Sequence, residues 1–81
     1  MTEVTYARLE TALLSLGFVQ RGVHEKNKIF RHDATGALVI YPEFPSENAV
    51  LPRHLLAVKS ILHAYGISDP DGFSLELQKA S

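Results

Sequence analysis

The sequence predicts an α+β fold in the order helix, three antiparallel strands, helix and short C-terminal helix. Two stretches carry apolar residues at helical spacing, and the stretch between them alternates as strands do. The connections within that middle stretch are too short for parallel strands. We therefore expect a three-stranded antiparallel sheet that both long helices cover on one face, with the other face open.

The clearest single element is a β-hairpin with arms at residues 28–32 and 37–41, both rich in β-branched and aromatic residues. The connection between the arms ends in Gly36, which suits a type I turn closed by a residue with positive φ. Leu38 and Ile40 are expected to share one face of the sheet. Val39 and Tyr41 are expected on the opposite face. A lone hairpin is barely stable in water, so the helices are expected to cover one of its two faces.

A first helix is expected over residues 3–16. Thr2 is its expected N-cap, because a threonine hydroxyl can accept a hydrogen bond from the first turn. Gly17 follows at a position where a residue with positive φ commonly ends a helix. Helical spacing separates the apolar residues, which are Tyr6, Leu9, Leu13 and Leu16.

A second helix is expected over residues 52–65, where Pro52 suits the first helical position and Gly66 the end. Asp69-Pro70 then repeats the signal for a helix start. The spacing of two apolar residues predicts a short third helix that packs back on the body: Phe73 and Leu77.

The remaining segments connect these elements. Residues 18–23 are predicted to form the first strand, and the polar residues 22–27 a loop or a wide hairpin turn. Residues 42–48 contain two prolines, which end strand pairing and predict an extended surface loop.

Composition narrows the class of protein. The 81 residues are 46% hydrophobic, have a net charge of −1 and include no cysteine, which suits one domain over residues 1–81 without disulfides. No apolar run approaches the ~20 residues of a membrane helix. The acidic N-terminal residues argue against a signal peptide, so we expect a cytoplasmic protein that does not bind a membrane. With near-zero net charge, RNA binding would need a local basic patch.

Neither a metal site nor a cofactor is expected. His54 and His63 lie on nearly opposite faces of the second helix, so each is expected at the helix surface. Without cysteine or an HxxxH pair, the sequence offers no zinc ligand set. It also contains no nucleophile elbow and no glycine-rich phosphate loop. His24 and His32 flank the first hairpin arm, and their spacing leaves open whether they meet.

The strongest local charge pattern is basic. Four of the eight Lys and Arg residues fall within a short stretch: Arg21, Lys26, Lys28 and Arg31. His24 and His32 lie among them, opposed by Glu25 and Asp33. Such side chains could contact RNA phosphates with salt-dependent affinity. The alternative is a solvated strand face, because lysines on an edge strand also guard against aggregation.

Several short motifs follow one another in an order shared with one protein family. Leu16-Gly17-Phe18-Val19 ends the first helix, Ile29-Phe30-Arg31-His32 lies in a strand, and Leu38-Val39-Ile40 follows in the hairpin. A proline-bearing loop and a helix ending in Gly66-Ile67 come next. In this order and spacing the chain resembles the HicA family of toxin–antitoxin mRNA interferases, which have a double-stranded-RNA-binding-like fold. The tail, residues 69–77, resembles an extension seen in some HicA-like proteins.

The motif that defines this family departs from its pattern here. It consists of Gly-Ser-His, two further residues and an aromatic, and its histidine catalyses RNA cleavage. If Phe30 is the aromatic, the catalytic position falls on Asn27, whose amide cannot act as a general base. The alternative matches Gly22-Val23-His24 to Gly-Ser-His and needs a three-residue insertion before the aromatic.

Three functions remain open. The first is a HicA-like protein that binds RNA or an antitoxin-like partner without cleavage, with RNA contacts from Arg21, Lys26, Lys28, Arg31 and His32. The second is an active endoribonuclease that uses His24 or, as a weaker choice, His32. The third is an interaction module whose open sheet face or edge strand forms a homodimer or binds a partner protein.

Overall fold

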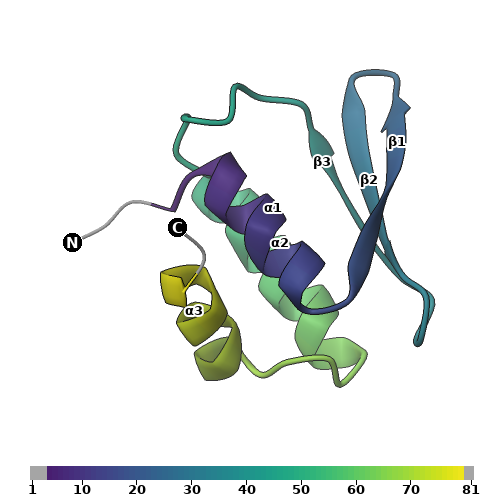
Figure 1. The fold of residues 1–81 in the computed structure, drawn as a ribbon. Helices are drawn as coiled ribbons and strands as arrows, with labels where there is room; N and C mark the ends of the chain where they lie inside the picture. Colours follow the sequence, from purple (N-terminus) through teal and green to yellow (C-terminus); the bar gives the residue numbers. More distant parts are fainter. Residues whose placement is uncertain (1–3, 80–81) are drawn as a thin grey trace.

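The computed structural model describes residues 4–79 (Figure 1). The described elements are α1 (Tyr6–Ser15), β1 (Phe18–His24), β2 (Asn27–His32), β3 (Ala37–Pro42), α2 (Pro52–Ala64) and α3 (Pro70–Lys79). The helices α1 and α2 lie against one face of the sheet, and α3 packs on them from the side away from it (Figure 1). The predicted α+β architecture is therefore confirmed. None of these helices is long and apolar enough to cross a membrane.

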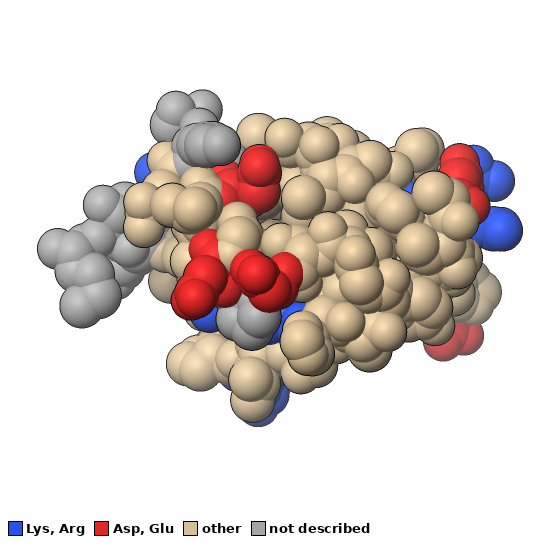
Figure 2. Space-filling model, turned by 90° about the horizontal axis from the view of Figure 1, so that it is seen from below, with Lys and Arg blue, Asp and Glu red and all other residues tan. Residues whose placement is uncertain are grey.

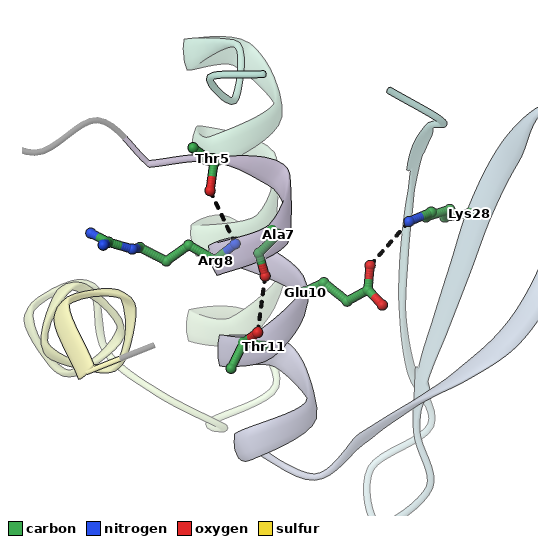
Figure 3. A network of polar contacts seen from close by, with 6 residues as sticks. All are labelled: Thr5, Ala7, Arg8, Glu10, Thr11 and Lys28. Atoms are coloured by element: carbon green, nitrogen blue, oxygen red, sulfur yellow. Dashed lines mark hydrogen bonds and ion pairs between the residues drawn. The ribbon is translucent and has the colours of Figure 1, made fainter. Parts of the chain in front are cut away.

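The helix α1 begins later than predicted, and Thr5 is its N-cap. The Thr5 hydroxyl accepts a hydrogen bond from the backbone N–H of Arg8 at 3.2 Å (Figure 3). The predicted cap, Thr2, lies outside the described residues. Thr5 instead forms a β-bridge with Ala49, which holds the chain extended up to the helix start. Backbone N–H groups of the first turn also donate to carbonyls of the loop after β3.

The sheet has the strand order β1-β2-β3, with both pairs antiparallel. Residues directly opposite each other share a face, so Phe30 and its partner Val39 point toward the helices together. Leu38 and Ile40 share one face, as predicted, and this is the face away from the helices, where both are exposed. The alternation of buried and exposed side chains in β3 thus also tells which residues of β2 face the helices.

One hydrophobic core joins the sheet to all three helices. Its largest fully buried side chains come from every layer, and they are Phe30, Phe73, Leu9, Leu13, Leu62 and Val39. Phe73 and Leu77 of α3 belong to this core, as the sequence predicts. Among the residues whose burial is described, the hydroxyls of Tyr6 and Tyr41 are the only side-chain polar groups on buried residues. The fold is therefore held together mainly by apolar packing.

The connection between β1 and β2 is tighter than the predicted loop. The strands pair up to His24 and Asn27, which leaves only Glu25 and Lys26 in the turn. Both turn residues have positive φ, 51° and 66°, as in the two-residue turns that favour Asn-Gly. The sequence did not predict this turn because neither residue type favours the left-handed conformation.

We expect Lys26→Gly to raise the free energy of unfolding by about 1 kcal/mol. A residue with a Cβ destabilises the folded state by roughly 1–2 kcal/mol when it adopts the left-handed conformation, and glycine removes this strain. Part of the gain is lost because glycine gives the unfolded chain more conformational entropy. Urea unfolding followed by circular dichroism measures the change. Lys26→Ala is the matched control, since it removes the charge and keeps the Cβ. Equal gains from both variants would assign the effect to charge and not to the backbone.

Candidate functional site

The end of the β1–β2 hairpin brings together His24 and Asn27, the two residues that the resemblance offers as alternatives for a catalytic position. His24 and Asn27 are direct cross-strand partners that flank the two-residue turn. The Nε2 atom of His24 lies 3.9 Å from a Glu25 carboxylate oxygen, and the Asn27 amide donates to the Glu25 carbonyl oxygen at 3.2 Å. Both alignments of the motif therefore lead to the same place on the molecule.

The chemistry available at this hairpin end is limited. RNA cleavage by acid–base catalysis needs positioned groups that take and give protons. His24 is exposed, and the one ion pair that it forms among the described residues is with the neighbouring Glu25. Lys26 in the turn adds an exposed positive charge. This arrangement can contact a phosphate, but it does not show a positioned catalytic pair.

The sheet divides the predicted basic patch between its two faces. Lys28 lies on the helix side, where its Nζ atom is 3.0 Å from the Glu10 carboxylate of α1 and its side chain is only 18% exposed (Figure 3). Arg31 lies on the open face, with its Nε atom 3.5 Å from Asp33. Arg21 is the extra residue of a β-bulge in β1 and is exposed. Only part of the predicted patch can therefore meet one ligand.

His32 joins three parts of the fold. Its Nε2 atom lies 3.2 Å from the carbonyl oxygen of Leu16, and its Nδ1 atom lies 2.9 Å from the Thr35 hydroxyl. A carbonyl can only accept, so we assign the proton to Nε2, and Nδ1 then accepts from Thr35. The Thr35 oxygen in turn accepts from the N–H of Ala37. Both ring nitrogens of His32 are therefore hydrogen-bonded, and together they connect the end of α1 to the β2–β3 turn.

Gly17 is required beside this histidine for two reasons. Its φ of 98° lies in the left-handed region, and a Cβ at this position would come within 3.3 Å of the His32 Nε2 atom. The predicted role of Gly17 in ending the first helix is confirmed by its backbone conformation. The close approach to His32 was not foreseen, because it depends on the sheet register.

An aromatic cluster around His54 was missed by the sequence reasoning. His54 is partly buried, and its Nδ1 atom lies 3.0 Å from the Tyr6 hydroxyl. The Tyr6 ring stacks on Phe44, with ring centroids 4.9 Å apart, and lies near Tyr41. His54 therefore lies at the helix surface with one side covered by this cluster, whereas His63 is exposed as expected. The available signal was Phe44, an aromatic residue inside a proline-bounded loop.

We expect acid to weaken the fold through His54. Burial, and next the charge of Arg53, lower the pKa of His54 from its ordinary value of 6.5. A histidine whose pKa is lower in the folded state stabilises the fold above its unfolded pKa, and this contribution is lost as the pH falls through the folded pKa. The midpoint of thermal unfolding, measured from pH 7.5 to pH 4.5, should fall less steeply in His54→Gln. His63→Gln is the control, and an unchanged slope in His54→Gln would contradict this assignment.

Acidic side chains gather on the α3 side of the molecule, with some Lys and Arg beside them, and charges of both signs also lie on the sheet side (Figure 2). Two acids of α3 and its cap have structural partners. An Asp69 carboxylate oxygen accepts from the N–H of Gly72 at 2.6 Å, and Glu76 accepts from the Ser15 hydroxyl at 3.3 Å. Because carboxylates repel phosphates, the α3 side is a poor surface for RNA. The hairpin end lies away from it (Figure 1).

The described part of the chain contains no group of three or more His, Asp or Glu side chains that could hold a metal ion. Comparisons with protein families, curated proteins and solved structures found no match to this chain.

Proposed function

We propose that this chain is a HicA-like RNA-binding domain that contacts RNA at the β1–β2 hairpin end without cleaving it. The observation that carries the proposal is the pairing of His24 with Asn27 across the two-residue turn. Whichever alignment with the family motif is used, the matched residue lies here. The more direct alignment puts an amide where cleavage needs a proton-transfer group.

The charges near this hairpin end support contact with RNA phosphates. Arg21 and Lys26 are exposed, and from Phe18 to His32 the one acid is Glu25 of the turn, whose carboxylate lies 3.9 Å from His24 Nε2. The Asn27 amide can form hydrogen bonds with a phosphate or a base edge. We place this binding in the cytoplasm, where messenger RNA is available to a protein without disulfides.

We expect the wild-type protein to shift defined single- or double-stranded RNA in a gel without cutting it, with weaker binding at higher salt. Arg21→Gln together with Lys26→Gln should weaken binding and reduce the slope of log affinity against log salt by about 1 for each phosphate that is no longer bound. Arg53→Gln with Lys59→Gln is the matched control on α2. No shift, or equal losses in both double variants, would contradict RNA binding at the hairpin end.

The same gels test the catalytic assignment. Asn27→His should create detectable cleavage if residue 27 occupies the family's catalytic position. Cleavage by the wild-type protein that His24→Ala abolishes would instead identify an active endoribonuclease using His24. Retained folding of both variants is checked by their circular dichroism spectra.

A further inference from the structure

We propose that the open face of the sheet binds an acidic amphipathic helix of a partner protein. This face lies opposite α1 and α2 (Figure 1). Three of its side chains are large, apolar and well exposed: Val19 at 44%, Leu38 at 47% and Ile40 at 56%. Scattered exposed apolar residues are ordinary, whereas a contiguous group of them marks an interaction surface.

The strand register makes this group contiguous. Val19, Arg31 and Leu38 form one cross-strand row, and Gly22, Ile29 and Ile40 form the next. Residues in one row share a face, and neighbouring side chains in a row lie roughly 5 Å apart. Gly22 has no side chain and no described atom near its Cβ position, so the β1 edge is open beside Ile29.

The dimensions of the face suit a helix. Strands of six residues are about 20 Å long, and the outer strands of a three-stranded sheet lie about 10 Å apart. A helix of about 13 residues has the same length and a diameter of about 10–12 Å. One helix lying along the strands would therefore cover both rows.

Charge selects an acidic partner. The three strands contain no Asp or Glu, and Arg31 is the one charged residue in the two rows. Lys28 does not add to this face, because it lies on the helix side and pairs with Glu10. The single ion pair of Arg31 within residues 4–79 is a 3.5 Å contact from Nε to Asp33, with the Arg31 side chain half exposed. This contact involves Nε alone, so a carboxylate of the partner can bind the two terminal nitrogens of the guanidinium through parallel hydrogen bonds when the face is covered.

Other occupants match these rows less well. RNA needs several cations for its phosphates and aromatic rings for its bases, and the two rows offer one cation and no aromatic side chain. A second copy of this chain would bring a second Arg31 to the contact and no carboxylate from its strands. An acidic helix supplies both the apolar stripe and a second carboxylate for Arg31.

The test uses two helical peptides of about 15 residues, long enough to span the strands. They share one leucine stripe and carry either Glu or Lys at the positions beside it. We expect the Glu peptide to bind the full chain at least tenfold more tightly by fluorescence anisotropy, and to shift the amide NMR signals of β1, β2 and β3. Leu38→Thr with Ile40→Thr should weaken binding at least tenfold.

Two further variants make the result specific. Leu56→Thr with Leu75→Thr is the matched control, since these leucines are 66% and 56% exposed on α2 and α3. Arg31→Glu should reverse the preference between the two peptides. No binding, equal binding of both peptides, or equal losses in both double variants would overturn the proposal. A dimer that Leu38→Thr with Ile40→Thr dissociates would also overturn it in favour of a second copy.

Discussion

Phe73→Ala should lower the free energy of unfolding by about 3–5 kcal/mol, the usual loss when a fully buried phenylalanine is truncated. Phe73 lies on α3 and has no exposed surface. It packs into the core shared by the sheet and the two long helices. A domain of this size has a total stability of about 4–12 kcal/mol, so the variant should be largely unfolded or close to it. Urea unfolding followed by circular dichroism gives the loss.

Leu75→Ala is the matched control on the same helix. Leu75 is exposed, so its truncation should change stability by less than about 0.5 kcal/mol. The contrast tests whether the C-terminal helix is part of the folded domain or an appendage. A loss below about 1 kcal/mol in Phe73→Ala would show that α3 contributes little to the core.

The elements that the sequence predicts correctly are those set by local periodicity. The apolar spacing of Leu9 and Leu13, and of Phe73 and Leu77, depends only on 3.6 residues per turn. The alternation of β3 depends only on the strand repeat of two. The position of the N-cap of α1, Thr5, depends instead on a β-bridge to Ala49, a residue far away in the chain. Local apolar spacing contains no information about this bridge.

The candidate site likewise has one feature that strand alternation predicts and one that it does not. Lys28 and Arg31 are three positions apart in one strand, so strand alternation alone puts them on opposite faces of the sheet. The sequence could therefore have excluded a single basic patch that contains both residues. The meeting of His24 and Asn27 could not be predicted in this way. It requires a turn of two residues, and Glu25 and Lys26 adopt that turn against their conformational preference.

Tyr41→Phe should raise the free energy of unfolding by about 1–2 kcal/mol, because a buried hydroxyl without a partner costs roughly 1–3 kcal/mol. Tyr41 is buried, and among the described side chains its hydroxyl is the one buried polar atom without a hydrogen-bond partner. Burial, followed by the nearby Glu10 and Tyr6, raises the pKa of Tyr41, so the hydroxyl keeps its proton. Paired urea titrations of the two proteins measure the gain.

Tyr6→Phe removes the same atom from a neighbouring ring and should have the opposite effect. The Tyr6 hydroxyl bonds to His54 Nδ1 at 3.0 Å and lies 3.4 Å from the N–H of Leu51, so its removal leaves both groups without that partner. We expect a loss of about 1–2 kcal/mol. Opposite signs would show that hydrogen-bond satisfaction, and not the burial of a hydroxyl as such, sets the stability of this cluster. If Tyr41→Phe is also destabilising, the Tyr41 hydroxyl has a partner in solution.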